Sequence, residues 1–158
     1  MELAQRHAGQ VSRDIARAFA NSRRLSAFEQ GALPACDIVN CNRIRVSEDA
    51  SFVLSGTAIT LGYNIFFGDG AFDYPTLVHE VTHVVQFSVL FGENAGGYSR
   101  YFGALWIDAW ATGSDPYHAE PLSRGRSFWS YNLEQQAQIA QDCRIQGWQS
   151  TACAISPF

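Results

Sequence analysis

The chain has 158 residues, of which 47% are hydrophobic, 13% aromatic and 16% charged, and its formal net charge is −4. This composition excludes a disordered chain, and the length predicts a single domain over residues 1–158. Residues 1–45 hold seven arginines and four acidic residues, a net charge of +3, whereas residues 46–158 hold four arginines and eleven acidic residues, −7. The acidic excess after residue 45 repels phosphate, which argues against a nucleic-acid partner.

The sequence contains neither a predicted membrane span nor a recognisable signal peptide. No apolar run approaches the roughly 18 residues that cross a bilayer. The N-terminus is polar and contains arginine, without a following apolar core. If the protein leaves the cell, it therefore uses a route that needs no signal peptide, or a signal has been removed.

The four cysteines form two pairs that are close in sequence, Cys36 with Cys41 and Cys143 with Cys153. Neither spacing matches the short spacing of a zinc knuckle. Four cysteines allow three disulfide pairings, of which we expect the local one, with free thiols as the alternative. If the local bridges form, they indicate an oxidising location such as a periplasm or the outside of the cell.

The first third of the chain is predicted to contain helix, loop and a short strand. Residues 2–30 form one or two helices, because apolar residues recur at helical spacing and arginines lie on other faces. Gly31 and Pro34 end this region, and residues 35–42 are a cysteine-containing loop. Residues 43–47 alternate in polarity and predict a short strand. The N-terminal helices either dock a partner or form half of the core.

The clearest predicted strand covers residues 58–67. Apolar side chains occupy every second position of this segment: Ile59, Leu61, Tyr63, Ile65 and Phe67. Such alternation places all five on one face of a single strand, and we expect that face to be buried.

Three helices are predicted after this strand. The first covers residues 75–91, with Pro75 in its first turn, Asp73 or Tyr74 near its N-cap and Gly92 beyond its end. The others cover about 98–112 and about 131–146. The sequence therefore predicts an α+β fold, with an N-terminal helix, a small, mostly antiparallel sheet packed on helix 75–91, and two or more C-terminal helices.

Helix 75–91 contains the motif His79-Glu80-Val81-Thr82-His83. On a helix, His79 and His83 lie on the same face one turn apart, so that both imidazoles can bind one tetrahedral cation. Glu80 then lies beside the open coordination position as a general base. Because the helix is largely apolar, burying these side chains without partners would be costly. The motif predicts a Zn²⁺ site; the alternative is a surface helix without a metal.

A catalytic zinc normally takes a third protein ligand and leaves one position open. Glu134 is the preferred third ligand, because it lies in the first turn of helix 131–146 and the small Ala137 on the same face permits close approach. His118 is the next candidate, followed by Asp108 and Asp142.

Two glutamines lie near this predicted site. Gln138 shares the helical face of Glu134, and we expect it to hydrogen-bond the second nitrogen of a ligand histidine. Gln86 follows His79 by seven positions. It is either a support for the site or a polar core residue.

The motif and two downstream segments resemble a group of small bacterial zinc-metallopeptidase-like domains. These domains occur as, or beside, effectors of contractile injection systems, including type VI secretion and Rhs-associated proteins. The matching segments are His79–Gln86, Pro116–Tyr117 and Tyr131–Ala137, so the resemblance covers about residues 74–143. More distantly, Glu134-x-x-Ala137 is similar to the Glu-x-x-Ala-Asp pattern of gluzincin peptidases. This chain has Gln138 where that pattern has Asp.

The resemblance implies a zincin-like fold and zinc-dependent hydrolysis of peptide bonds. The implied roles are metal binding by His79, His83 and Glu134 and general-base catalysis by Glu80.

Two further expectations concern the substrate. The oxyanion of the transition state needs a second stabilising group, for which we expect Tyr117 or His118, or Tyr131, because the irregular segment before Glu134 should border the cleft. As in gluzincins, strand 58–67 is expected to border the cleft and to bind extended peptide by strand addition.

The resemblance also implies a bacterial effector or toxin that is secreted or delivered by a secretion apparatus and acts in the periplasm or outside the cell. The expected substrate is a peptide, a protein or a peptidoglycan stem peptide, and the expected partner is an immunity protein or a component of the apparatus. The alternative is a metal-bearing, non-catalytic binding or cargo module of an injection apparatus. Glu80 argues against this alternative, because a structural zinc needs no base and is usually closed by a fourth protein ligand.

Overall fold

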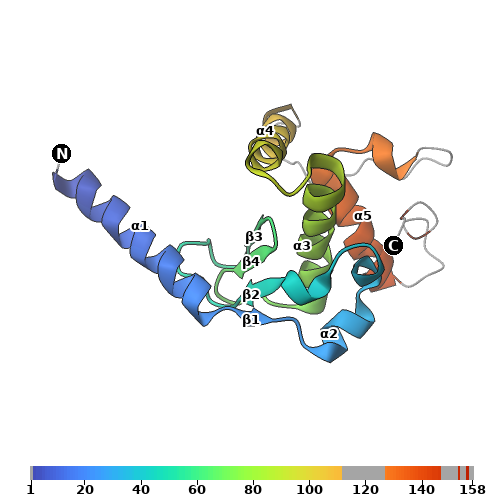
Figure 1. Ribbon diagram of the computed structural model, residues 1–158, viewed down its shortest axis with the longest axis horizontal. Helices are drawn as coiled ribbons and strands as arrows, with labels where there is room; N and C mark the ends of the chain where they lie inside the picture. Colours follow the sequence, from blue (N-terminus) through green and yellow to red (C-terminus); the bar gives the residue numbers. More distant parts are fainter. Residues whose placement is uncertain (1, 112–126, 147–152, 154–155, 157–158) are drawn as a thin grey trace.

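Five α-helices and a small four-stranded sheet make up the part of the chain that a computed structural model describes, residues 2–111, 127–146, 153 and 156 (Figure 1). The α-helices are α1 (Glu2–Asn21), α2 (Ala27–Ala32), α3 (Tyr74–Gln86), α4 (Ala95–Ala111) and α5 (Leu133–Gln146). The strands are β1 (Arg23–Arg24), β2 (Arg45–Ser47), β3 (Ala58–Leu61) and β4 (Asn64–Phe67). Short helical turns are η1 (Pro34–Asp37), η2 (Cys41–Arg43), η3 (Phe87–Phe91) and η4 (Phe128–Ser130). The predicted α+β class is confirmed. Among the described residues, no helix has the length and apolar character needed to cross a bilayer.

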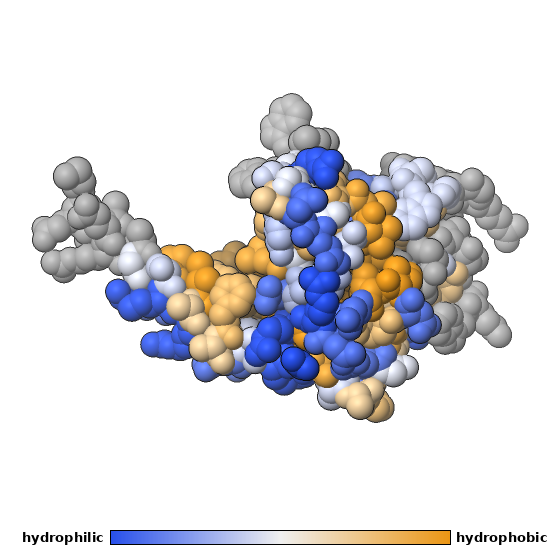
Figure 2. Space-filling view, in the orientation of Figure 1, coloured by the Kyte–Doolittle hydropathy of each residue, from blue (hydrophilic) through white to orange (hydrophobic). Residues whose placement is uncertain are grey.

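The region predicted as one or two helices, residues 2–30, contains α1 and most of α2, with β1 between them. Helix α1 projects from the rest of the molecule (Figure 1), and hydrophobic residues lie on one side of its part nearest the sheet (Figure 2). Its last turn packs on the sheet, where Ala18 is buried and the ring of Phe19 meets that of Phe66 edge-on at 5.0 Å. Val11 remains 49% exposed. Among the described side chains of α1, the one that is buried in the core therefore lies in its last turn.

The strand predicted over residues 58–67 is wrong, because this segment is a hairpin of β3 and β4. Leu61 pairs with Asn64, so Gly62 and Tyr63 form a two-residue turn. Gly62 has a φ of +64°, and a side chain there would meet the hydroxyl of Tyr98. Reversal at a two-residue turn changes which positions share a face. The odd-numbered apolar residues are consequently divided between the two faces of the sheet.

The sheet has the strand order β1-β2-β4-β3, with β2 and β4 parallel and the other two pairs antiparallel. Ile65 and Phe67 belong to the main core cluster, which also contains apolar side chains of α3. Phe66 points to the opposite face of the sheet and packs with Ala18 and Val53. Among the described residues, no strand pairs with the outer side of β3. The sheet thus has two covered faces and one end strand beside α3.

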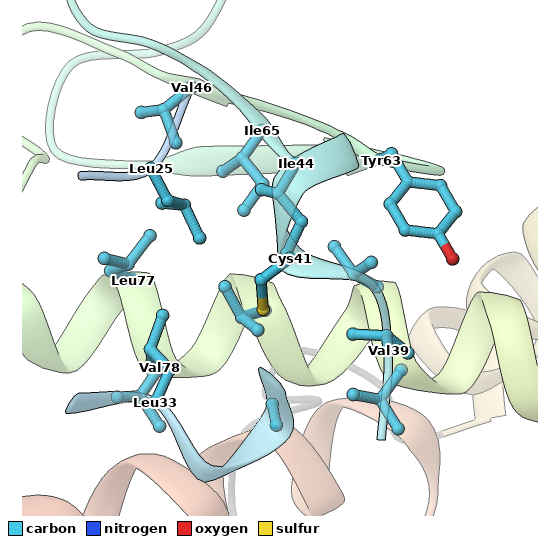
Figure 3. Packing of buried hydrophobic residues seen from close by; sticks show 14 of the residues in the cluster. Leu25, Leu33, Val39, Cys41, Ile44, Val46, Tyr63, Ile65, Leu77 and Val78 are labelled. Carbon is cyan, nitrogen blue, oxygen red and sulfur yellow. The ribbon is translucent and has the colours of Figure 1, made fainter. Parts of the chain in front are cut away.

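Helix α3 is buried along most of its length. It begins where Asp73 Oδ1 accepts a hydrogen bond from the Thr76 amide at 2.7 Å, with Pro75 in the first turn. Every residue from Leu77 to Gln86 is buried. The helix continues as the π-helical turn η3, and the chain leaves it at Gly92, whose φ is +80°. Figure 3 shows side chains of the sheet and of the preceding loop converging on Leu77 and Val78 of α3.

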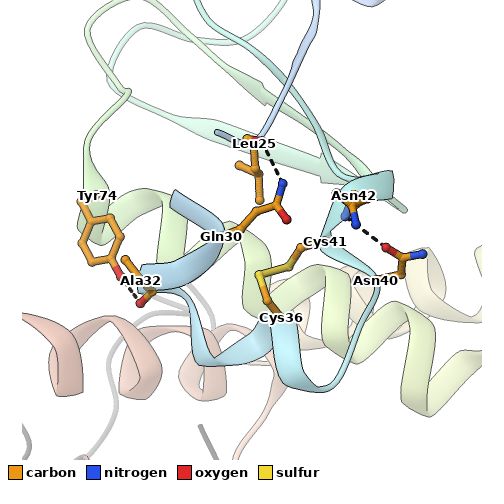
Figure 4. The surroundings of a disulfide bond; sticks show 8 residues. All are labelled: Leu25, Gln30, Ala32, Cys36, Asn40, Cys41, Asn42 and Tyr74. Atoms are coloured by element: carbon orange, nitrogen blue, oxygen red, sulfur yellow. Dashed lines mark hydrogen bonds between the residues drawn. A yellow bond between two sulfur atoms is a disulfide. The ribbon is translucent and has the colours of Figure 1, made fainter. Parts of the chain in front are cut away.

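Both disulfides have the local pairing that the sequence predicts, Cys36–Cys41 and Cys143–Cys153. Cys36–Cys41 joins η1 to η2, and hydrogen bonds fix the surrounding loop (Figure 4). Among them, Tyr74 at the start of α3 donates through its hydroxyl to the Ala32 carbonyl at 2.6 Å. The first bridge therefore fastens the loop beside the beginning of α3.

Gly68 is a position where the backbone leaves no room for a side chain. A Cβ at Gly68 would lie 2.1 Å from the Leu54 carbonyl oxygen, which is backbone and cannot move aside cheaply. We expect Gly68→Ala to lower the free energy of unfolding by about 2 kcal/mol or more, as measured by urea denaturation. The control, Gly31→Ala in α2, has open space around the added methyl group and should raise stability by about 0.5–1 kcal/mol. Equal effects at the two positions would contradict this packing.

The ion pair between Arg23 and Glu29 predicts a pH dependence of stability. The Arg23 guanidinium donates to Glu29 at 2.8 and 2.9 Å, and this hydrogen bonding lowers the carboxyl pKa to about 2. Because that pKa is higher in the unfolded chain, the stabilisation is complete above about pH 4.5 and is lost as the pH falls toward 2. The stability difference between wild type and Glu29→Gln should shrink over this window in denaturation measurements. A difference that stays constant down to pH 2 would contradict the ion pair.

Candidate metal centre

Three predicted ligand side chains meet between α3 and α5. His79 and His83 are one turn apart on α3, and Glu134 lies in the first turn of α5. The Nε2 atoms of the two histidines are 3.2 Å apart. Glu134 Oε2 lies 3.3 Å from His79 Nε2 and 3.4 Å from His83 Nε2. Both histidines are buried, and the side chain of Glu134 is 16% exposed. Two imidazole nitrogens and one carboxylate oxygen thus form a nearly equilateral triangle.

The size of this triangle fits a tetrahedral metal ion. Ligand atoms about 2.0–2.1 Å from a tetrahedral zinc lie roughly 3.3–3.4 Å from one another. The observed separations of 3.2–3.4 Å match that spacing. These three residues are the one group of at least three His, Cys, Asp or Glu side chains within the described residues that could hold a metal ion. The donor set, two imidazoles and one carboxylate, suits zinc.

The charges of the three side chains also favour a cation. Burial by itself would lower the pKa of His83, but the hydrogen bond and the charge of Glu134 outweigh this and raise it to about 9. Burial would raise the pKa of Glu134, yet its hydrogen bonds to His79 and His83 hold it well below its usual range. A largely buried carboxylate therefore attracts positive charge to this point, and binding of a metal there would displace a proton.

Gln86 fixes the orientation of His83. Its Nε2 donates to the Leu133 carbonyl at 2.9 Å, so its Oε1 is the atom that faces His83 Nδ1, at 2.8 Å. An oxygen can only accept, so Nδ1 carries a proton, and the proton displaced by a metal would leave the lone pair of Nε2 directed at the triangle. Gln136 extends the network, accepting from Gln86 and donating to the Tyr131 carbonyl. The same contacts hold the start of α5 against α3.

The supporting role that the sequence assigned to Gln138 belongs to Gln86 in the structure. Gln138 donates instead to Asp142 at 2.8 Å, one turn along α5. Gln86 combines the two roles that the sequence allows for it, because it is 1% exposed in the core and also contacts His83.

Glu80 is held by a residue that the sequence did not single out. Glu80 is buried, and its Oε2 accepts a hydrogen bond from Thr60 Oγ1 at 2.7 Å. Thr60 lies on β3, on the face of the hairpin that packs toward α3, and its hydroxyl also contacts the Glu80 carbonyl at 3.2 Å. The sequence signal for this contact is Thr60 itself, a polar residue within the otherwise apolar strand β3. The end strand of the sheet thus positions the carboxylate beside the triangle.

Two cavities of about 240 Å³ each adjoin the ligands and share Ala58, His79 and Glu80. One cavity is further lined by Ile59, Thr60, His83, Tyr101, Phe102 and Glu134. The other is further lined by Gly56, Thr57, Thr76, Gln138 and Gln141. Strand β3 borders both, so the two cavities follow the end strand past the metal ligands.

The other predicted site residues have varied positions. Tyr117 and His118 lie outside the described residues. Tyr131 is 5% exposed and packs in a small cluster with Phe128 and Ile139. Asp142 accepts from Gln138 on α5. Asp108 belongs to α4, but its side chain is not among those described.

Comparison with protein-family models, curated proteins and solved structures gives no match for this chain. An assignment of function consequently rests on the geometry of its own residues.

The contact between Gln86 and His83 can be tested by removing the amide. Gln86→Leu should weaken zinc affinity about 10- to 100-fold, because His83 Nδ1 loses its acceptor and the ring is no longer held. Competition with a chromophoric chelator measures this affinity. The control is Gln138→Leu, which removes an amide from the same region without touching His83 and should change the affinity less than threefold. Similar losses in both variants would contradict the role of Gln86.

Proposed function

We propose that this chain is a zinc-dependent metallopeptidase of the gluzincin type. The observation that carries the proposal is the triangle of His79, His83 and Glu134 with the Glu80 carboxylate held beside it. The arrangement of elements supports a zincin-like fold, because the motif helix packs between the end strand of a sheet and the helix that supplies the third ligand. The donor triangle uses three protein ligands, as open catalytic zinc sites do.

In this proposal, zinc held by His79, His83 and Glu134 supplies Lewis acidity to the reaction. Glu80 moves the proton: its carboxylate takes one from the water molecule that adds to the peptide carbonyl carbon, and gives it to the leaving amine as the C–N bond breaks. Thr60 donates to Glu80 Oε2, which holds the carboxylate in one orientation and leaves its other oxygen for the water. The charge and position of Glu80 thus allow it to carry the proton from the water molecule to the leaving amine.

The surroundings of the site favour an extended peptide as substrate. Strand β3 is an end strand of the sheet that the described residues form, a position that would suit pairing with an extended peptide. Ile59 on this strand is 42% exposed. The two cavities beside β3 would receive side chains on either side of the cleaved bond. Both a protein and a peptidoglycan stem peptide satisfy this description.

We further propose that the enzyme works in an oxidising compartment, as a secreted or injected bacterial effector or toxin. Two disulfides among the four cysteines support such a location. An immunity protein or a component of the secretion apparatus would then be its partner.

Glu80→Gln separates metal binding from catalysis. The variant should retain one zinc per chain and lose peptide hydrolysis by about 10²–10⁴-fold, because the amide cannot take the proton. Zinc content is measured by elemental analysis, and cleavage by mass spectrometry on mixed protein and peptidoglycan substrates. Glu48→Gln, the same substitution at a half-exposed surface position, should leave both properties unchanged.

Two results would redirect the assignment. A wild-type protein that holds zinc but cleaves neither substrate class would indicate the non-catalytic binding or cargo module. Full zinc stoichiometry in Glu134→Ala would remove Glu134 from the site.

A further inference from the structure

Tyr101 on α4 carries a buried hydroxyl group without a hydrogen-bond partner. The residue is 0% exposed, and its hydroxyl is the one buried side-chain nitrogen or oxygen among the described residues that lacks a partner. A buried hydroxyl left unpaired costs about 1–3 kcal/mol. Proteins rarely keep an unpaired hydroxyl in the core. We therefore expect the partner of this hydroxyl to be a ligand that is bound only part of the time.

The ring of Tyr101 is held beside the ligand triangle. It packs against His83 with ring centroids 6.5 Å apart and against Phe87 at 5.9 Å. Tyr101 also lines the cavity of about 240 Å³ that His79, His83, Glu80 and Glu134 line. Tyr101 is therefore part of the wall of the cavity that the metal-ligand candidates also line.

Tyr63 shows what a satisfied tyrosine in the same aromatic cluster looks like. It packs edge-on against Phe87, and its hydroxyl contacts Glu93 at 2.5 Å and Ser88 at 3.2 Å. The two tyrosines thus both pack against Phe87 and differ in whether the hydroxyl has a partner in the protein itself.

We propose that the Tyr101 hydroxyl donates a hydrogen bond to an oxygen atom of the molecule bound at His79, His83 and Glu134, and is a further catalytic residue. This inference rests on the proposed function. A phenol with a usual pKa near 10 is protonated at neutral pH and can donate. In a cavity that excludes water, such a donor stabilises an oxygen that gains negative charge in the transition state.

Two oxygens of a bound molecule could accept this hydrogen bond, the carbonyl oxygen of the cleaved bond and a carboxylate oxygen at a chain end.

The aromatic residues around Tyr101 explain why the sequence did not reveal the role of Tyr101. Tyr98, Tyr101 and Phe102 together form an aromatic stripe on α4, a pattern typical of core packing.

The first test compares the stability of the metal-free proteins. Tyr101→Phe removes an unpaired hydroxyl, so its Tm should stay unchanged or rise by about 2–4 °C. The matched control, Tyr63→Phe, removes a paired hydroxyl and should lower Tm by a similar amount. A fall in Tm for Tyr101→Phe as large as that for Tyr63→Phe would overturn the proposal, because it would show that the hydroxyl is satisfied within the fold.

The second test measures binding by calorimetry to the zinc-loaded proteins. Acetohydroxamate offers oxygens to the metal without a chain-end carboxylate, and a dipeptide offers such a carboxylate. Tyr101→Phe should weaken at least one of them about tenfold, and Tyr63→Phe should leave both within twofold of wild type. A loss for acetohydroxamate identifies the reacting oxygen, and a loss for the dipeptide alone identifies the chain end. Unchanged affinity for both ligands, or no binding of either to loaded wild type, would overturn the proposal.

The tests also separate this proposal from the peptidase assignment. Zinc binding with weakened ligand affinity in Tyr101→Phe, but no peptide cleavage by wild type, would leave the role of Tyr101 standing and end the peptidase proposal. Failure of wild type to bind zinc would end both.

Discussion

The contact between α3 and α5 brings one carboxylate onto two buried imidazoles, and the other features of the site are arranged around it. Helix α3 is buried from Leu77 to Gln86, so His79 and His83 lie where water cannot solvate them. Glu134 gives them a partner of opposite charge at 3.3 and 3.4 Å. The same three atoms have the spacing of tetrahedral metal ligands. A single packing contact thus satisfies the buried polar groups and forms the candidate metal site.

Each neighbouring element contributes one constraint to this contact. Gln86 joins α3 to the first turn of α5 and sets the protonation of His83 through hydrogen bonds at 2.8 and 2.9 Å. Thr60 links the end strand of the sheet to Glu80. The Cys36–Cys41 bridge fastens the loop that packs beside the start of α3. These contacts come from separate parts of the sequence and fix the candidate site from several sides.

Features carried by local sequence could be predicted, and those that depend on packing could not. The cap at Asp73, the spacing of His79 and His83 and the local disulfides follow from short-range geometry. Glu134 was found because its position in the first turn of a helix could be read from the sequence.

The misassigned strand and the missed contacts have physical causes. Alternation over residues 58–67 has the same period in one strand as in two, and only Gly62 within the pattern indicated a turn. Helical spacing is compatible with either Gln86 or Gln138 as the residue that supports a ligand histidine. Which of the two contacts the histidine depends on how α3 is rotated about its axis against α5. For Tyr101, the missing partner of the hydroxyl is visible only after the core is assembled.

The most direct test of the central claim is X-ray absorption spectroscopy at the zinc edge of protein loaded with one equivalent of the metal. The account predicts a first shell of nitrogen and oxygen atoms at about 2.0–2.1 Å, with outer-shell scattering from two imidazole rings. Since all four cysteines are in disulfides, no sulfur should appear in that shell. A sulfur ligand, scattering from fewer than two imidazoles, or failure to bind one zinc per chain would contradict the proposed metal centre.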